Sequence, residues 1–332
     1  MVSIYEIARQ AGVSPSTVAR ALSGKGYCSA EKKQRILELA KKLDYSPSHA
    51  ARTLKSNITS KVLFCIPDIY NPFYFRMIRG VSEVLEKHDY LPLLCPTRGE
   101  AGLELRMLQN LREGWGDGMV FVSFNFTPDN IAAVNAAQRP VVLTNNYPEG
   151  PDDRFDAVYI DTVEGIAMSC RHFIAQGIRD IGYIGGSPAV QTGRERLAGY
   201  TQALREAAIP MTADWILDGD FSTVSGETAM RRLAALPKRP EALVVANDLM
   251  AIGALKVCRE LHIRVPEDLA IIGMDDSDSA QLIGLSSVRM REDEIGRLAA
   301  ELLMDRILSG PRPRRTLRLQ PELSLRASSE KI

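Results

Sequence analysis

The stretch GVSPSTVARALSG, residues 12–24, places several hydrogen-bonding side chains on two turns of a predicted helix. The hydroxyl groups of Ser14, Ser16 and Thr17 can bind phosphate oxygens or base edges. The forked guanidinium of Arg20 can bridge two acceptors of one guanine. A helix that only packs against a core does not need such a small, polar outer face. The stretch therefore predicts a nucleic-acid-binding helix, with a small helical bundle lacking any ligand as the simpler alternative.

Local signals make this helix the second of three. Residues 4–11 have helical apolar spacing, and Gly12 ends them. Ser14 is a suitable N-cap, and Pro15 then occupies the first helical position of a helix that runs to about residue 23. Ser29 caps a third helix that runs to Leu43. The apolar residues expected to face inward are Val18, Leu22, Ile36, Leu37, Leu39, Ala40 and Leu43. Helix, tight turn and short helix together form a helix-turn-helix.

The charge of the chain is unevenly distributed, although the formal net charge is zero. Residues 1–60 contain ten Lys and Arg against four Asp and Glu, a net charge of +6. The remaining residues contain 31 basic and 37 acidic side chains, a net charge of −6. A basic head on a mildly acidic body indicates a polyanionic partner at one end of the protein.

Composition narrows the class of protein. A length of 332 residues predicts two or three domains. No apolar run approaches the roughly 20 residues of a membrane span, and the N-terminus does not resemble a signal peptide, so we expect a cytoplasmic protein. The cysteines are scattered singly and the histidines are isolated, which argues against a disulfide framework or a zinc site. We expect no metal and no cofactor.

A different pattern begins at Lys61, where short apolar strands alternate with helical stretches. Examples of the strands are KVLFCIP, GMVFV, ALVVAND and LAIIGMDD. Such strands predict parallel sheets covered by helices on both faces, and their number suits two similar lobes. In these sheets ligands bind beyond the carboxyl ends of the strands. Polar residues close several strands, namely Asp68, Asn145, Asn247, Asp248, Asp275 and Asp276.

Between head and core lies DYSPSHAARTLKSNITS, residues 44–60. Ser46 and Pro47 predict a short helix that ends near Leu54. A helix with so little apolar surface is only marginally stable by itself, so we expect it to form only when it packs against a partner.

Several motifs in one order resemble the LacI/GalR family of bacterial transcriptional repressors over essentially the whole chain. They are IYEIARQAGVSPSTVARALSG, KKLDYSPSHAARTLK, IPDIYNPFYFRMIRGV, YIGG, RERLAGY, ANDLMAIGAL, RVPEDLAIIGMDD and PELSLRASS. The resemblance implies a small all-α helix-turn-helix DNA-binding head plus an α/β periplasmic-binding-protein-like core of two doubly wound parallel-sheet lobes. The expected parts are a DNA-binding domain at 1–45, a hinge helix and linker at 46–60, an N-terminal core lobe at 61–160 and 291–318, and a C-terminal core lobe at 161–290 and 319–332.

The resemblance also implies DNA-binding roles for individual residues. Base-reading positions of the family fall on Pro15, Ser16 and Arg20, and positions of phosphate contact or orientation fall on Tyr5, Ser14 and Thr17. In the hinge, Leu54 matches the residue that family members insert between central base pairs, and Lys55 lies beside it. Ala19 departs from the family, which often has a serine there, so one phosphate contact is in doubt.

The family's effector pocket maps onto residues that follow the core strands. The matching residues are Asn71, Phe73, Tyr74, Asn145, Thr192, Arg196, Phe221, Asn247 and Asp275. Carboxylate, amide and arginine groups around aromatic faces suit a sugar or a nucleoside-like ligand. Asn145 is often acidic in relatives and Val190 can be arginine in purine-binding members, which argues against a purine and leaves the class of sugar open. Any one of these residues, such as Asn247 or Asp275, could instead be a helix cap.

The function implied is a repressor, a homodimer that binds a pseudo-palindromic double-stranded operator and responds to a sugar-like small molecule. A solute-binding protein of sugar transport is the alternative, but it would need a signal peptide and would lack the basic head. Enzymatic activity is not expected, because YIGGSP lacks the G-x-G-x-x-G pattern and no P-loop is present. No leucine heptads follow RASSEKI, so a dimer rather than a tetramer is expected. Whether the effector releases or tightens DNA stays open.

Overall fold

The computed structural model describes residues 3–23, 26–45, 57–124, 127–146 and 155–330. The chain divides into two compact units, residues 1–59 and 60–332. The predicted hinge helix, with Leu54 and Lys55, lies outside the described residues.

The first unit contains the three predicted helices, α1 (Ile4–Ala11), α2 (Pro15–Ser23) and α3 (Ala30–Lys42). Gly12 ends α1 in the left-handed conformation, with φ of 65°. A small core holds the helices together, formed by Ile7, Ala8, Ala11, Val18, Ala21, Ile36 and Ala40. The expectation that Leu37 faces inward is wrong, because its side chain is 41% exposed. From α3, Ile36 and Ala40 are buried in this core and Leu39 packs against it, which leaves Leu37 on the outer side of the helix.

The second unit contains two six-stranded sheets. The first sheet has the strand order β11 (Thr316–Leu319), β5 (Asp156–Ile160), β4 (Val141–Leu143), β3 (Gly118–Phe121), β1 (Lys61–Ile66) and β2 (Leu91–Pro96). All of its neighbouring strands are parallel. Its helices are α5 (Phe73–Glu86), α6 (Ala101–Arg112), α7 (Pro128–Asn135) and α13 (Glu292–Ser309).

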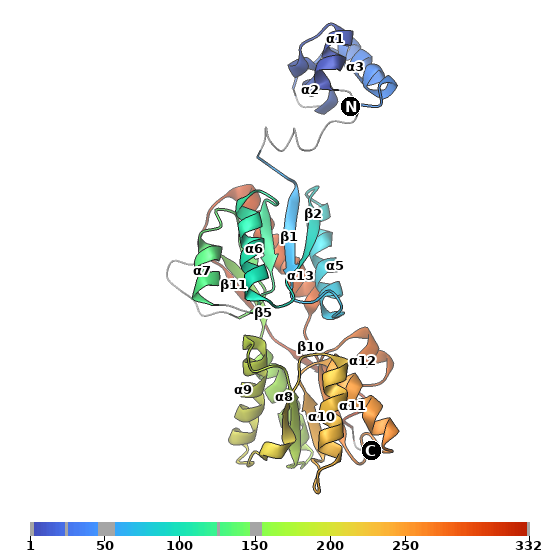
Figure 1. Cartoon of the computed structure of the whole chain (residues 1–332), viewed down its shortest axis with the longest axis vertical. Coiled ribbons are helices and arrows are strands. Elements are labelled where there is room, and N and C mark those ends of the chain that lie inside the picture. The colour runs from blue at the N-terminus through green and yellow to red at the C-terminus, as the bar shows by residue number, and fades with distance from the viewer. Residues whose placement is uncertain (1–2, 24–25, 46–56, 125–126, 147–154, 331–332) are drawn as a thin grey trace. The chain divides into compact units, whose positions relative to one another are not determined.

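Apolar side chains on both faces of β1 explain why helices cover both faces of this sheet. Val62, Phe64 and Ile66 join the core beneath α5 and α13, whereas Leu63 and Cys65 join a separate core beneath α6 and α7. Figure 1 shows these two helix layers on either side of the upper sheet. The predicted doubly wound architecture is confirmed.

The second sheet has the order β12 (Glu322–Ser324), β10 (Ser286–Arg289), β9 (Ala270–Asp275), β8 (Ala242–Val245), β6 (Ile181–Gly185) and β7 (Ile216–Asp218). Only β12, at one edge of this described sheet, is antiparallel to its neighbour. Its helices are α8 (Thr162–Ala175), α9 (Gln191–Glu206), α10 (Thr223–Ala234), α11 (Asp248–Glu260) and the short α12 (Asp278–Leu282). In Figure 1 the pair α8 and α9 and the pair α10 and α11 cover opposite faces.

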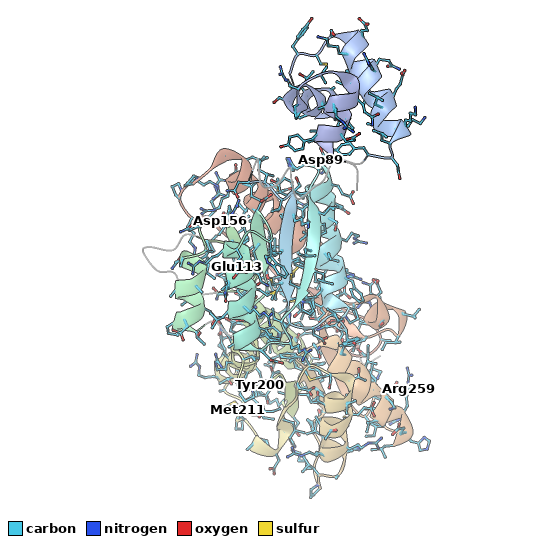
Figure 2. The ribbon with its side chains drawn as sticks, turned by 45° about the horizontal axis from the view of Figure 1, so that its top comes forward. Asp89, Glu113, Asp156, Tyr200, Met211 and Arg259 are labelled. Carbon is cyan, nitrogen blue, oxygen red and sulfur yellow. The ribbon has the colours of Figure 1, made fainter. Side chains whose placement is uncertain are left out.

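The chain crosses between the sheets after β5, after β10 and after β11. Helix α13, which follows β10 of the second sheet, therefore returns to pack on α5 and the first sheet. Its attachment includes fully buried Asp156 (Figure 2), which pairs with Arg306 at 2.7 Å and with Arg312 at 2.8 Å. Burial opposes ionisation of Asp156, but the hydrogen bonds from both arginines hold its pKa below the ordinary value.

Candidate functional site

The N-terminal turn of helix α2 is polar, and its own side chains stabilise it through hydrogen bonds. The Thr17 backbone N–H donates to Ser14 Oγ at 3.3 Å, and the two hydroxyl groups lie 2.9 Å apart. Arg20 Nε reaches back to the Ser16 carbonyl at 3.3 Å. Val18 and Ala21 occupy the opposite side of the helix and are buried. The amphipathic spacing thus directs the hydroxyl and guanidinium groups away from the head's core.

The described residues predicted to bind DNA are all at least partly accessible. Tyr5, Ser14, Ser16 and Arg20 are exposed, and Pro15 and Thr17 are half-buried. Five of the six lie in or beside the first two turns of α2, and Tyr5 lies in the first turn of α1. These exposed hydroxyl and arginine groups near the N-terminus of the helix do not pack in the core, and they suit contacts with phosphates and base edges.

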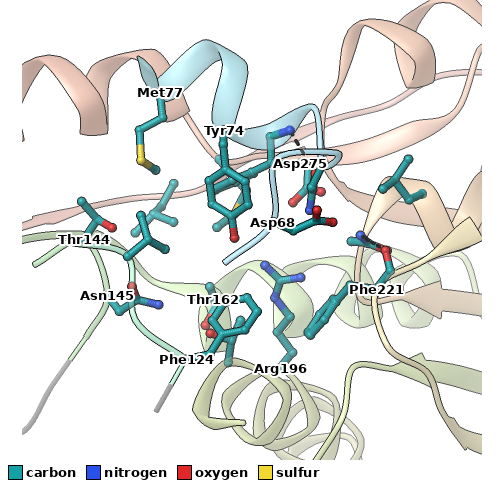
Figure 3. A pocket seen from close by; sticks show the side chains of 18 of the residues that line it. Asp68, Tyr74, Met77, Phe124, Thr144, Asn145, Thr162, Arg196, Phe221 and Asp275 are labelled. Carbon is teal, nitrogen blue, oxygen red and sulfur yellow. Dashed lines mark hydrogen bonds between the residues drawn. The ribbon is translucent and has the colours of Figure 1, made fainter. Parts of the chain in front are cut away.

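The nine residues predicted to bind an effector line one cavity of about 470 Å³ in the core (Figure 3). They are Asn71, Phe73, Tyr74, Asn145, Thr192, Arg196, Phe221, Asn247 and Asp275. Each lies in a loop or helix start beyond the carboxyl end of a strand, or on a helix that begins there. Both sheets contribute, so the cavity is a cleft between the two halves of the core.

Other residues line the cleft that the sequence did not single out. Examples are Phe124, Thr144, Glu195 and Asp220. Phe124 follows β3, and its ring centroid lies 6.2 Å from that of Phe221. Asp220 follows β7, a three-residue strand that the sequence pattern did not predict. The signal that could have found Phe124 and Thr144 is their place just after strands already identified.

Arg196 projects into the middle of the cleft (Figure 3). Its guanidinium lies 5.3 Å from the ring centroid of Phe221, a cation–π arrangement, and donates a hydrogen bond to the Ala246 carbonyl. Its side chain is buried, with 6% exposed. The arginine and the aromatic ring therefore form one preorganised surface of the second half of the core.

Asp275 ends β9 with φ of 124°, a conformation that residues with side chains seldom adopt. Burial raises the pKa of its carboxyl well above the ordinary range, although nearby Arg196 favours the ionised form. Ser277, rather than Asp275, caps the following helix α12. The carboxyl of Asp275 is therefore held at the cleft without serving as a helix cap.

Two of the predicted residues already have structural partners. Asn247 caps α11 by accepting from the Met250 N–H at 3.0 Å, and its amide donates to the Phe221 carbonyl at 3.0 Å. Asn71 accepts from the Phe73 N–H at 3.0 Å. These side chains shape the cleft and hold Phe221 and Phe73 in place, as the cap alternative predicts for Asn247.

Three buried polar atoms at the cleft have no hydrogen-bond partner among the described residues: Thr144 Oγ1, Asn145 Oδ1 and Arg196 Nε. They come from both halves of the core and include a donor, an acceptor and a hydroxyl. Buried polar groups in folded proteins almost always have partners. Unsatisfied groups that surround one cavity indicate a site built for a polar ligand.

The described residues show neither a metal-binding cluster nor a membrane-spanning helix. No three His, Cys, Asp or Glu side chains of that part of the chain lie where they could hold a metal ion. None of its helices is both long enough and apolar enough to cross a bilayer.

Comparisons with known proteins agree with this arrangement of head and core. Residues 3–48 match the family described as bacterial regulatory proteins, lacI family, and residues 170–329 match a periplasmic binding protein-like domain. The HTH-type transcriptional repressor PurR of Mannheimia succiniciproducens is 30% identical over 335 residues, which cover 100% of both chains.

Solved structures give the same result. The structure of the transcriptional regulator CelR–cellobiose complex has a TM-score of 0.74 and 28% identity, covering 99% of this chain and 100% of that one. The lac repressor dimer bound to operator and the anti-inducer ONPF has a TM-score of 0.87 and 21% identity, covering 99% of each chain, and shares the fold. The head is thus the DNA-binding helix-turn-helix of a transcription regulator. The chain belongs to the lacI family of bacterial regulatory proteins.

Proposed function

We propose that this protein is a repressor that binds a pseudo-palindromic operator as a homodimer and is controlled by a neutral sugar in the core cleft. Relatives with these properties in their names support the proposal: a transcriptional repressor, a repressor dimer bound to operator and a regulator bound to cellobiose. Its site of action is the cytoplasm, where bacterial DNA lies. The proposed role is binding and release, without chemical conversion of the ligand.

The observation that carries the sugar assignment is the combination of unsatisfied polar atoms and aromatic faces in one cleft. A sugar hydroxyl is both donor and acceptor, so it can satisfy Thr144 Oγ1, Asn145 Oδ1 and Arg196 Nε alike. The apolar face of a pyranose can pack on Phe221 or Phe124, whose rings line the same cavity.

Charge around the cleft favours a neutral sugar over a sugar phosphate. Among its described lining residues Arg196 is the only cation, whereas Asp68, Glu195, Asp220 and Asp275 are acidic. Hydrogen bonds from Ser222 and Ser225 lower the pKa of Asp220, which keeps it ionised. A phosphate would be repelled by the ionised carboxylate of Asp220 and would find a single arginine that already contacts Phe221 and Ala246.

A second copy of the chain is the proposed partner of an apolar edge on the first lobe. Strand β2 ends the described part of its sheet and exposes 65% of Leu91, 38% of Leu93 and 42% of Leu94. Phe75, on the adjoining helix α5, is 58% exposed. An unpaired apolar edge strand is a liability unless a partner covers it, and a homodimer covers the same edge in both chains.

In the proposed complex Pro15, Ser16 and Arg20 read base edges, and Tyr5, Ser14 and Thr17 hold the backbone. Leu54 is proposed to enter the minor groove from the hinge, with Lys55 near the phosphates. Two-fold symmetry of the dimer then requires an inverted repeat in the DNA.

Two experiments test the function directly. Selection of binding sites from a random DNA pool should recover an inverted repeat that binds two chains per duplex. Calorimetry should detect binding of cellobiose, the sugar bound in the CelR complex, or of another neutral sugar in a panel, with each sugar recovered unchanged. Recovery of a single half-site would contradict the dimeric operator. Tighter binding of glucose 6-phosphate than of every neutral sugar would contradict the assignment of the cleft.

A further inference from the structure

Arg76 of helix α5 connects the two halves of the core beside the cleft. Its Nη1 donates to the main-chain carbonyl of Asp276 at 3.1 Å, and its Nη2 pairs with the carboxylate of Asp278. Helix α5 packs on the first sheet, whereas Asp276 lies in the turn between β9 and α12 of the second lobe and Asp278 is the first residue of α12. Asp276 is also the residue immediately after Asp275 of the cleft. One side chain of the first half therefore contacts the segment that carries the cleft's aspartate.

The turn that Arg76 contacts forms several hydrogen bonds and an ion pair with other residues of the second lobe. The Asp276 N–H donates to Ser287 Oγ at 2.9 Å, and the Asp276 carboxylate pairs with Arg326 at 2.7 Å. Buried Asp248 accepts from Ser287 Oγ at 2.6 Å and from the Ser277 N–H at 2.7 Å. These partners attach the turn to β10, to the start of α11 and to Arg326 of the second lobe.

Backbone conformation links Asp275 to the carbonyl that Arg76 binds. Asp275 and Asp276 have φ of 124° and 55°, in regions that residues with side chains rarely adopt. Such conformations persist only where the surroundings enforce them, and they concentrate at ligand sites and switches. A displacement of the Asp275 backbone must therefore also shift the Asp276 carbonyl.

Exposure shows which of the two Arg76 contacts matters. The Arg76 side chain is 22% exposed, but that of Asp278 is 91% exposed, so the ion pair is weakened by solvent. The hydrogen bond to the Asp276 carbonyl is the protected contact. Arginine suits the position because its planar fork reaches both acceptors at once, which the ammonium of lysine does not.

We propose that Arg76 is a positioning residue that couples Asp275 in the cleft to helix α5, and thereby transmits occupancy of the cleft to the first half of the core. The same helix carries Phe73 and Tyr74 into the cleft and Phe75 onto the apolar edge assigned to the partner chain. The inference rests on the proposed function for its biological meaning. The contact itself can be tested without any effector.

The first test is hydrogen–deuterium exchange of the full chain in wild-type protein and in Arg76→Met. Loss of the protected hydrogen bond should speed exchange about fivefold in residues 276–284, on the opposite side of the cleft from the substitution. Asp278→Asn should change this exchange less than twofold, because it removes only the exposed ion pair.

Arg79→Met is the matched control. Arg79 lies one turn further along α5, is 65% exposed, and is 3.9 Å from Asp293 of α13, which packs on the same sheet as α5. It should leave residues 276–284 unchanged. Faster exchange confined to α5 in Arg76→Met, or an equal effect of Arg79→Met, would overturn the coupling. Equal thermal midpoints of the variants exclude general destabilisation as the cause.

The second test adds cellobiose to protein bound to the selected operator DNA. Addition of the sugar should change the operator affinity of the wild-type protein. In Arg76→Met this sugar-induced change should be about tenfold smaller, although the variant still binds the sugar. Arg76→Lys should behave like Arg76→Met, since it lacks the fork. If wild type ignores every sugar in the panel, the proposed effector class fails, and the exchange experiment still decides the role of Arg76. If Arg76→Met responds fully, the coupling is wrong.

Discussion

The head and the cleft hold their functional side chains in opposite environments. On α2 the hydroxyls and Arg20 lie on an exposed helical face above a core of seven small or branched side chains. In the cleft Arg196, Asp275 and Thr144 are each less than 9% exposed and come from separate elements. Exposed charges are screened by salt, whereas buried groups depend on burial and exact partners. The two sites should therefore respond to different perturbations.

Salt concentration should have the largest effect, and it should change DNA affinity far more than sugar affinity. Operator affinity should fall by a factor on the order of 10³ between about 50 and 200 mM salt, because each neutralised phosphate releases counterions. Affinity of the cleft for a neutral sugar should change less than about twofold over the same range. Titration of operator and sugar at several salt concentrations measures both. A shallow salt dependence of operator binding would remove the basic head from the interface.

Removal of the cleft's arginine should have the next largest effect. Arg196→Ala should weaken sugar binding by about 3 kcal/mol, roughly a hundredfold, because it removes a buried cation and its contact with Phe221. Operator binding without the sugar should stay near wild type. Arg205→Ala, exposed at the end of the same helix, is the control for both. Wild-type sugar affinity in Arg196→Ala, measured by calorimetry, would show that the cleft is misassigned.

The pH dependence of stability should originate beside the cleft, at Glu292. Burial raises its pKa to about 7, with Arg76 opposing the rise and Asp248 and Asp293 adding to it. The folded chain then keeps a proton that the unfolded chain releases near its ordinary pKa of 4.5. The stability from Glu292 is thus complete below that value and is lost as pH rises through about 7.

Glu292→Gln should remove this loss and raise the free energy of unfolding at about pH 8 by about 2 kcal/mol relative to wild type. Urea unfolding at several pH values measures the difference. Some decline should persist, since burial also raises the pKa of Asp248 to about 6. Glu301→Gln, on the same helix but exposed, should change stability by less than about 0.5 kcal/mol. Parallel pH profiles of Glu292→Gln and wild type would contradict the assignment.

Arg20→Ala should give an effect of similar size, and one that depends on the DNA. We expect a loss of about 1–3 kcal/mol on the selected operator and much less on random DNA, because a base contact carries sequence information and a phosphate contact does not. Binding titrations on both DNAs measure the contrast. Equal losses would place Arg20 on phosphate, and the head would then read sequence through other residues.

The sequence alone determined the elements whose signals are local. Ser14 and Pro15 start α2 and Gly12 ends α1, since caps act over a few residues. The nine residues that the family resemblance assigned to an effector site line one cavity. The pattern missed β7, β10, β11 and β12, which have three or four residues each and lack the continuous apolar run of the strands that were predicted.

Only the tertiary structure decided which of these residues carry spare hydrogen-bonding capacity. Asn247 and Asn145 both follow core strands, yet the amide of Asn247 donates to Phe221 and accepts from Met250, whereas Asn145 Oδ1 has no partner in the described chain. The link from Arg76 to Asp276 is likewise absent from any local pattern. It joins residues 200 positions apart, and it exists because the carboxyl ends of the two sheets lie on opposite sides of one cleft.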